Sequence, residues 1–269
     1  MPDVVLEARG LRKEYGELVA VDDVDLEVRE GGSLAIVGES GSGKTTIAKM
    51  IVGLTAPTAG TIVACGRDRS SPARGARERR RRGSEVQIVF QDPYSSLDPR
   101  QTAEQALNEV LRLHHRGTKD GRAARELLDL VGLDERQGRA LPRALSGGQR
   151  QRIAIARALA AQPRVIILDE SVAALDVSIQ AQILNLLADI REETGVSYVL
   201  ISHDLAVVRQ ITDEAIVMHR GRVVERGPTA QILDAPQDEY TQLLRASVPR
   251  PGWKPERRRR PSRDQGAPA

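Results

Sequence analysis

The first 37 residues show two patterns of hydrophobic and polar positions. Apolar residues alternate with polar ones over residues 4–8 and again over 24–28, whereas residues 33–37 form a short apolar run that ends at Gly38. Alternation with a period of two is typical of half-buried strands, and short apolar runs are typical of buried ones. We therefore predict that residues 4–37 form strands.

Strands and helices alternate along much of the remaining chain. This order is typical of an α/β fold, in which a mostly parallel sheet is covered by helices on both faces. Residues 92–160 interrupt the alternation with a mostly helical pattern, which predicts an inserted helical subdomain. The other predicted helices are 45–54, 178–193 and 204–211, and the predicted strands are 86–90, 165–168, 197–201, 215–219 and 222–225.

The segment Gly38–Thr45 carries the first motif with a chemical meaning. It reads Gly, four residues, Gly-Lys-Thr, and it lies between a predicted strand and a predicted helix. In such a P-loop the glycines let backbone N–H groups surround phosphate oxygens, and the helix N-terminus adds the positive end of its dipole. Lys44 would reach the β- and γ-phosphates, and the Thr45 hydroxyl would bind Mg²⁺. The motif predicts a nucleoside triphosphate site.

The buried strand predicted at residues 165–168 ends in two carboxylates, Asp169 and Glu170. Ligand sites of α/β sheets form at the carboxyl ends of the strands. Asp169 suits the coordination shell of Mg²⁺, and Glu170 suits orienting and deprotonating an attacking water. A strand that leads into an ordinary acidic helix start would show the same two residues, so the catalytic interpretation of the pair depends on the P-loop.

A second loop able to bind an anion is predicted at Leu145–Gln149, which reads Leu-Ser-Gly-Gly-Gln and precedes a helical pattern at 150–161. Ser146 and the two glycines expose backbone N–H groups at the helix N-terminus. A chain with one P-loop has no evident need for a second phosphate cradle. We infer that this cradle closes on the γ-phosphate held by another subunit.

These three motifs resemble those of the nucleotide-binding subunits of ABC transporters, and the resemblance covers about residues 4–245. It implies an α/β fold with a P-loop NTPase (RecA-like) core, an N-terminal antiparallel β subdomain and an inserted α-helical subdomain at about residues 92–160. The ATPase domain would span residues 1–245. The basic tail, residues 246–269, is rich in Pro, Arg and Gly from residue 249 on, and we predict that it is disordered.

The resemblance also implies roles for single residues. Gln91 resembles the glutamine that contacts Mg²⁺ and water, and His203 resembles the switch histidine that holds the γ-phosphate. Asp176 resembles the aspartate at the dimer seam, and Tyr15 the aromatic residue that stacks on adenine. The implied catalytic residues are Glu170, His203 and Gln91, and the implied magnesium ligands are Thr45, Gln91 and Asp169. The implied ATP contacts are Tyr15, Gly38, Ser40, Gly41, Gly43, Lys44, Thr45, Thr46, Ser146, Gly147, Gly148, Gln149 and Asp176.

Three further segments resemble the branch of the family that imports oligopeptides, dipeptides or nickel: Phe90–Arg100, Asp176–Gln182 and Ser202–Ala206. This likeness implies transmembrane permease subunits, a second ATPase subunit (identical or paralogous) and an extracytoplasmic solute-binding protein as partners. The chain would lie at the cytoplasmic face of the cell membrane and use ATP and Mg²⁺. One departure is that Ser171–Ala173 replaces the usual Pro-Thr-Ser after the catalytic glutamate.

Charge is spread unevenly over the chain. The formal net charge is +3, yet residues 67–83 hold eight arginines and residues 250–264 hold seven Lys or Arg, with two acidic residues in each segment. The remainder is therefore acidic, which disfavours a nucleic-acid partner, because such a partner needs a basic face on the domain. We predict that both basic segments are solvated, mobile chain. Cys65 is the only cysteine, which excludes an intramolecular disulfide.

Other functions remain open. A chromosome-type ABC ATPase would carry a long coiled coil before Leu145, where no sustained heptads occur, and ribosome-type members usually carry two ATPase domains in one chain. An ABC exporter ATPase is a further alternative. A P-loop kinase for small molecules would leave Leu145–Gln149 and His203 without a role. We favour the ATPase of an importer. No apolar run approaches the ~20 residues of a membrane-spanning helix.

Overall fold

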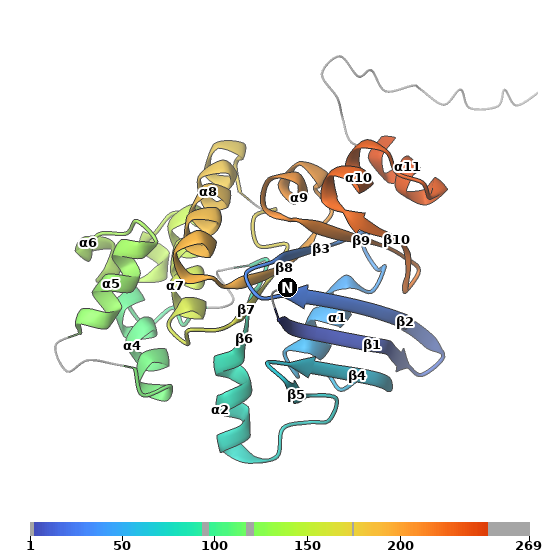
Figure 1. Cartoon of the computed structure of the whole chain (residues 1–269). Coiled ribbons are helices and arrows are strands. Elements are labelled where there is room, and N and C mark those ends of the chain that lie inside the picture. The colour runs from blue at the N-terminus through green and yellow to red at the C-terminus, as the bar shows by residue number, and fades with distance from the viewer. Residues whose placement is uncertain (1–2, 93–96, 117–120, 174, 247–269) are drawn as a thin grey trace, which may run out of the picture.

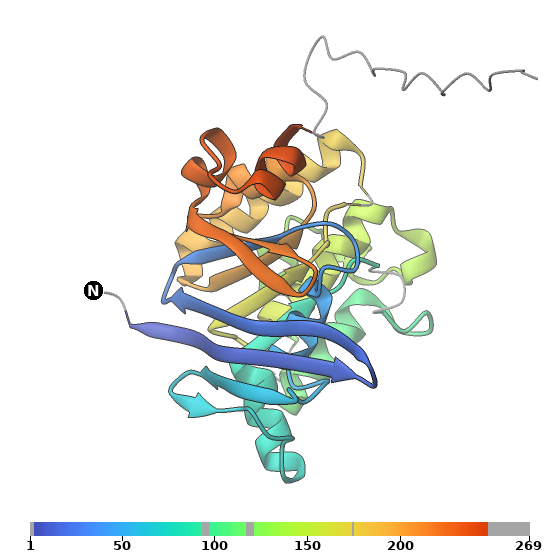
Figure 2. The ribbon, with the colours of Figure 1, turned by 90° about the vertical axis from the view of Figure 1, so that its right-hand side faces the viewer.

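The protein is described by a computed structural model that covers residues 3–92, 97–116, 121–173 and 175–246. Two sheets lie face to face, with helices on the outer face of the larger one (Figure 1). The smaller sheet is antiparallel, has the strand order β2-β1-β4-β5, and faces the viewer in Figure 2. Its strands are β1 (Val4–Tyr15), β2 (Leu18–Arg29), β4 (Ala59–Ala64) and β5 (Arg67–Asp68).

The larger sheet has the order β10-β9-β3-β8-β7-β6. Its strands are parallel except for β10, which pairs antiparallel with β9. The carboxyl ends of β3 and β7 therefore meet at one edge of the sheet, where the predicted phosphate and magnesium residues follow. The strands are β3 (Ser33–Val37), β6 (Val86–Val89), β7 (Val165–Asp169), β8 (Ser197–Ser202), β9 (Glu214–His219) and β10 (Arg222–Pro228).

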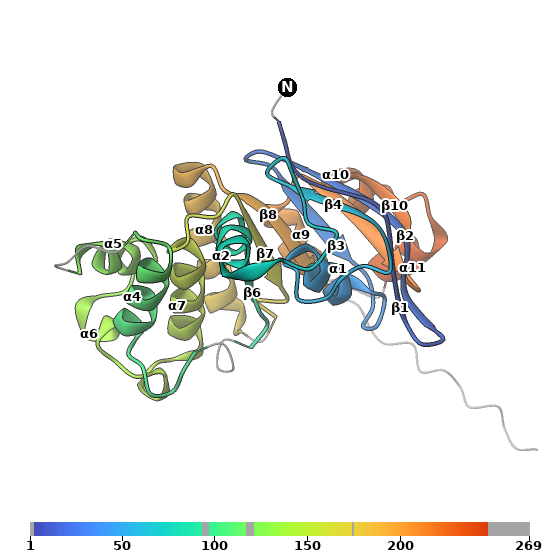
Figure 3. The ribbon, with the colours of Figure 1, turned by 90° about the horizontal axis from the view of Figure 1, so that it is seen from below.

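The helices fall into three groups. The first helix, α1 (Lys44–Ile51), lies between the two sheets (Figure 3). A helical region lies at the end of the molecule away from the antiparallel sheet (Figures 1 and 3) and comprises α4 (Ala103–Leu113), α5 (Arg122–Leu130), α6 (Glu135–Gly138), the 3-10 turn Pro142–Ala144 and α7 (Gly147–Leu159). The remaining helices are α2 (Gly75–Glu85), α8 (Val177–Thr194), α9 (Leu205–Ile211), α10 (Thr229–Asp234) and α11 (Glu239–Ala246).

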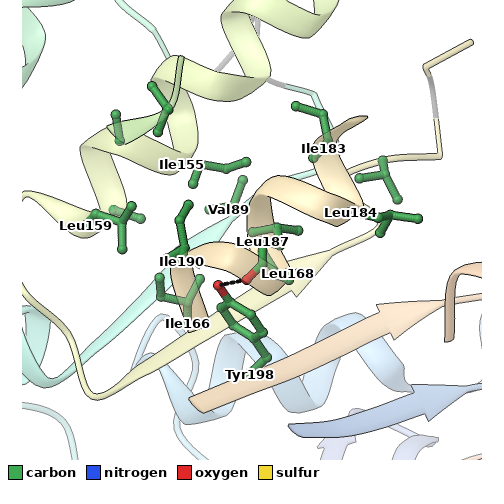
Figure 4. Close-up of a cluster of buried hydrophobic side chains, with 14 of the residues drawn as sticks. Val89, Ile155, Leu159, Ile166, Leu168, Ile183, Leu184, Leu187, Ile190 and Tyr198 are labelled. Atoms are coloured by element: carbon green, nitrogen blue, oxygen red, sulfur yellow. Dashed lines mark hydrogen bonds between the residues drawn. The ribbon is translucent and has the colours of Figure 1, made fainter. Parts of the chain in front are cut away.

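Two hydrophobic cores explain why the central strands are apolar on both faces. Alternate residues of β3 enter different cores: Leu34 and Ile36 pack between the sheets, whereas Ala35 and Val37 pack against the helices. Buried parallel strands read as continuous apolar runs for this reason. In the helix-side core, Tyr198 is fully buried, and its hydroxyl donates to the Leu187 carbonyl oxygen at 2.8 Å (Figure 4).

The arginine-rich segment 67–83 is folded, so the prediction that it is solvated, mobile chain was wrong. It contributes β5 and most of α2. The side chain of Arg69 is 2% exposed, and its Nη2 donates to Glu85 Oε2 at 2.6 Å. Arg82 is also buried, and its Nη2 donates to Glu78 Oε1 at 2.6 Å. The composition gives the charges of this segment, but it could not show that the α2 carboxylates Glu78 and Glu85 pair with four of its arginines.

Other differences are small. The helix predicted at residues 45–54 ends at Ile51, and α7 begins at Gly147. Sequence patterns did not predict β4, α10 or α11, which are short or weakly periodic. The predicted disordered tail begins at Ala246, which closes α11, and residues 247–269 lie outside the described residues. Within the described residues, no helix has the length and apolar character needed to span a membrane.

The buried pair Arg69–Glu85 generates a stability prediction. Glu85→Gln leaves the Arg69 guanidinium buried without its counter-charge, and we expect the free energy of unfolding to fall by about 3 kcal/mol. The matched control is Glu126→Gln, because Glu126 pairs with Arg122 at 3.4 Å on the surface, with both side chains about two-thirds exposed. That change should cost at most about 0.5 kcal/mol. Urea unfolding of both variants checks this, and equal losses would contradict it.

Candidate functional site

The P-loop lies between the end of β3 and the start of α1. Gly43 precedes the helix with φ +103°, a left-handed conformation that strongly favours glycine, and a Cβ there would lie 2.4 Å from the Ala20 carbonyl oxygen. The strand β2 therefore presses against the loop at this point. The loop is thus held on a tight path directly before a helix N-terminus, where N–H groups are available to bind phosphate.

A cavity of about 750 Å³ opens beside the P-loop, and we call it the P-loop cavity. Its lining brings together ten of the predicted site residues from four places in the sequence. These are Tyr15, Ser40, Gly41, Gly43, Lys44, Thr45, Thr46, Gln91, Asp169 and Glu170. Sequence reasoning did not assign a site role to the other lining residues, Leu18, Ala20, Lys49, Phe90 and Asp92, although each lies within five residues of a predicted one.

Lys44 provides the buried positive charge of the P-loop cavity, which Lys49 also lines. It is only 4% exposed, and its Nζ donates to the carbonyl oxygens of Gly38 and Glu39, at 2.7 Å each. Burial lowers the pKa of Lys44, while the negative charges of Glu170, Asp169 and Glu39 oppose this shift. An ammonium group so withdrawn from water gains strongly from a nearby polyanion, since electrostatic attraction grows as the local dielectric falls.

Asp169 and Thr45 place two oxygen-bearing side chains next to each other in the P-loop cavity. The Thr45 hydroxyl donates to Asp169 Oδ1 at 3.3 Å. Burial raises the pKa of Asp169, and the Thr45 hydrogen bond opposes that rise. A buried carboxylate beside a hydroxyl, with Gln91 on the same cavity wall, fits Mg²⁺ bound partly by protein oxygens and partly by phosphates.

Glu170 has a strained backbone and a histidine neighbour. Its φ is +48°, which is uncommon for a non-glycine residue and is often found at functional sites. The conformation is held by its N–H, which donates to the Ile201 carbonyl oxygen at 2.9 Å. His203 Nδ1 lies 3.4 Å from Glu170 Oε1. The two residues meet because they follow the adjacent parallel strands β7 and β8.

Tyr15 lies at an exposed part of the P-loop cavity. The Tyr15 ring is 49% exposed, and Leu18 beside it is 64% exposed. The Lys13 ammonium lies over the Tyr15 ring, 5.0 Å from its centroid, in a cation–π contact. An exposed aromatic face at the mouth of a phosphate site suits a stacked base.

The remaining predicted contacts gather elsewhere, in what we call the signature cluster: Ser146–Gln149 with Asp176. The Ser146 hydroxyl accepts from the Gln149 N–H at 3.2 Å, and the Gln149 side chain accepts from the Ser146 N–H at 2.9 Å, which forms a capping box at the start of α7. A Cβ on Gly148 would lie 2.6 Å from the Ile179 side chain on α8. Asp176 is the N-cap of α8.

The signature cluster and the P-loop cavity are separate in this chain. Among the described residues, the cavity lining includes no member of the signature cluster. Gly38 and His203 also lie outside the lining, but each contacts a lining residue, Lys44 and Glu170 respectively. The two predicted phosphate-binding loops therefore lie apart in this chain.

The family of the chain follows from its sequence relatives. The family model described as ABC transporter matches residues 21–173, more than half of the chain. This chain belongs to the ABC transporter family. It is 47% identical over 242 residues to the oligopeptide transport ATP-binding protein OppD of Mycobacterium tuberculosis, covering 90% of this chain but only 39% of the relative. The oligopeptide transport ATP-binding protein OppF of Lactococcus lactis is 44% identical over 234 residues, covering 86% of this chain and 73% of the relative.

Solved structures of ABC proteins share the fold. A dimeric ATP-binding cassette, MJ0796, bound to ADP and Pi in a post-hydrolysis state, has a TM-score of 0.72 and 31% identity, covering 83% of this chain and 98% of that one. The protein cbiO1 of Clostridium perfringens, part of the ABC transporter complex cbiONQ, has a TM-score of 0.76 and 26% identity, covering 93% and 98%. The predicted family and the predicted fold class are confirmed.

The contact between Gly43 and β2 generates a prediction about the P-loop. Gly43→Ala forces a methyl group against the Ala20 carbonyl oxygen. We expect the free energy of unfolding, without nucleotide, to fall by roughly 3 kcal/mol from overpacking together with backbone strain.

The matched control is Gly53→Ala, where φ is +81° and a Cβ would meet nothing within 4 Å. It should cost only about 1 kcal/mol of backbone strain. Thermal or urea unfolding compares the two variants. If both lose the same stability, β2 does not constrain the P-loop as described.

Proposed function

We propose that this chain binds and hydrolyses ATP as one of two ATPase subunits of an importer for peptides. The observation that carries the proposal is the convergence of Lys44, Asp169, Glu170 and Gln91 on the P-loop cavity, with His203 beside Glu170. The signature cluster, at the start of α7, supplies a second phosphate-binding surface for a partner's nucleotide.

ATP would be bound by groups that already line the P-loop cavity. Tyr15 would stack on the adenine, and the N–H groups of the P-loop would donate to the phosphates, as at other helix N-termini. The Lys44 ammonium would exchange its two carbonyl acceptors for phosphate oxygens. Thr45, Asp169 and Gln91 would hold Mg²⁺, whose charge offsets that of the phosphates when it is bound.

Glu170 is the proposed general base. Its carboxylate would orient the attacking water and accept a proton from it as the water oxygen adds to the γ-phosphorus, while the bond from that phosphorus to the β-phosphate oxygen breaks and ADP leaves. His203, 3.4 Å away, would hold the γ-phosphate and keep the Glu170 carboxylate in place. The strained backbone of Glu170 fixes the direction of the side chain before substrate arrives.

A second ATPase subunit, identical or paralogous, would complete each site. Ser146, Gly147 and Gly148 of one subunit would donate to the γ-phosphate bound by the other, and Asp176 would lie at the seam between them. The first turn of a helix leaves N–H groups without intrahelical partners, which makes such a contact favourable. Hydrolysis separates the γ-phosphate from ADP, and the dimer would reopen once inorganic phosphate leaves and the bridging charge is gone.

The transport role rests on the names of relatives. Both OppD and OppF are oligopeptide transport ATP-binding proteins, and a glutathione import ATP-binding protein of Salmonella paratyphi A is 46% identical over 235 residues. We therefore favour peptides over nickel, and import over export or a nucleic-acid partner. The chain would lie at the cytoplasmic face of the membrane, against permease subunits, and a solute-binding protein would deliver the peptide.

The proposed base generates the first functional prediction. Glu170→Gln keeps the shape of the side chain but removes the proton acceptor, so ATP turnover should fall at least ~100-fold while ATP binding is retained. The control is Glu193→Gln on the exposed face of α8, which should leave both unchanged. Phosphate release and binding of a fluorescent ATP analogue measure the two quantities. Normal turnover in Glu170→Gln would reject Glu170 as the base.

The proposed substrate is tested in living cells. A strain whose only copy of this gene carries Lys44→Ala should fail to take up labelled dipeptides and oligopeptides, because the charge that binds phosphate is gone. Nickel uptake should be unaffected. The substrate assignment would be wrong if peptide uptake stayed normal while the uptake of nickel or another solute was lost.

A further inference from the structure

The C-terminal helix α11 contacts the P-loop through Tyr240. The backbone N–H of Glu39 donates to the Tyr240 hydroxyl oxygen at 3.2 Å, across 201 positions of sequence. The carbonyl oxygen of the same residue, Glu39, accepts from Lys44 Nζ at 2.7 Å. Glu39 is thus held at its N–H by Tyr240 and at its carbonyl by Lys44, the buried positive charge of the P-loop cavity.

Tyr240 is itself fixed at its ring and its backbone. The centroids of the Tyr240 and His219 rings are 3.9 Å apart, with the ring planes inclined at 39°. The Tyr240 N–H donates to Asp238 Oδ1 at 2.9 Å. The Glu225 carboxylate accepts from the N–H groups of Gln237 and Asp238, at 2.8 and 3.2 Å. The residues just before α11 are therefore attached to β10 through Glu225, and the contact with His219 restricts the position of the Tyr240 ring.

Strand β9 and the turn after it contact the same loop. The Gly221 N–H donates to the Ser42 carbonyl oxygen at 3.2 Å, and the Met218 carbonyl oxygen lies 2.3 Å from where a Cβ on Gly38 would be. His219, on which Tyr240 stacks, lies between these two contacts in the sequence. The rear of the P-loop is thus backed by β9 and α11, elements outside the family match at residues 21–173.

We propose that Tyr240 is a positioning residue for the P-loop. Its hydroxyl accepts from the N–H of the Gly38–Glu39 peptide, and the carbonyl oxygens of Gly38 and Glu39 accept from the Lys44 ammonium, so the loop and its charge are arranged before nucleotide binds. A preorganised loop loses less conformational entropy on binding, and affinity rises accordingly. Tyr240 does not reach the P-loop cavity, so it acts only through Glu39. This inference rests on the proposed function.

The test uses the full chain and a fluorescent ATP analogue with Mg²⁺. Tyr240→Phe keeps the ring against His219 and removes only the hydroxyl. We expect the Kd for the analogue and the KM for ATP to rise about 3- to 10-fold, the size of one net hydrogen bond. The kcat at saturating ATP and the Tm without nucleotide should remain close to those of the unchanged chain.

The chain offers a matched control in Tyr198→Phe. It also removes one tyrosine hydroxyl, which here donates to Leu187 in the helix-side core. It should lower the Tm without nucleotide and leave the Kd unchanged. The inference is overturned if Tyr240→Phe binds with unchanged Kd, or if Tyr198→Phe raises the Kd as much, since the effect would then be one of general stability.

A third variant separates this inference from the function it rests on. Lys44→Ala should abolish binding of the analogue. If it does, while Tyr240→Phe binds normally, the positioning role alone is wrong. If Lys44→Ala binds as tightly as the unchanged chain, the P-loop cavity is not the ATP site, and both proposals are wrong.

Discussion

The path of the P-loop is the constraint on which the rest of the site depends. A chain that leaves β3 and enters α1 must turn with its N–H groups exposed to one side, and neighbouring backbone limits the space for that turn. The Ala20 carbonyl oxygen closes one side at Gly43, and the Met218 carbonyl oxygen closes another at Gly38. Side chains at these glycines would displace the loop, and the Lys44 ammonium with it. The parallel sheet then brings Asp169 and Glu170 to the same edge.

Electrostatics within the cavity follow from burial more than from net charge. Lys44 and Asp169 are both withdrawn from water, and burial shifts the pKa of each toward its neutral form, downward for Lys44 and upward for Asp169. Each charge also opposes the shift of the other. Buried charges of both signs favour a ligand that carries negative oxygens for Lys44 and a cation for Asp169. The overall charge of +3 reveals nothing of this arrangement.

Much of the fold could be predicted because its strands are buried on one or both faces, which imposes a period of two or a continuous apolar run. The P-loop and its neighbours could be predicted because their residue types follow from phosphate chemistry. The segment at residues 67–83 was misjudged because the burial of Arg69 depends on Glu85, a tertiary contact. For the same reason, no local pattern could show that His203 meets Glu170, or that Tyr240 reaches Glu39.

The central claim is that ATP is held between two subunits, since the signature cluster is separate from the P-loop cavity of its own chain. A photoreactive amino acid placed at Ser146 in the assembled transporter, with Glu170→Gln to prevent turnover, tests it directly. The account predicts that illumination crosslinks the residue at position 146 to the P-loop of the partner ATPase subunit, and that it does so only when ATP is bound. A link to the P-loop of the same chain, or an equal yield without ATP, would contradict it.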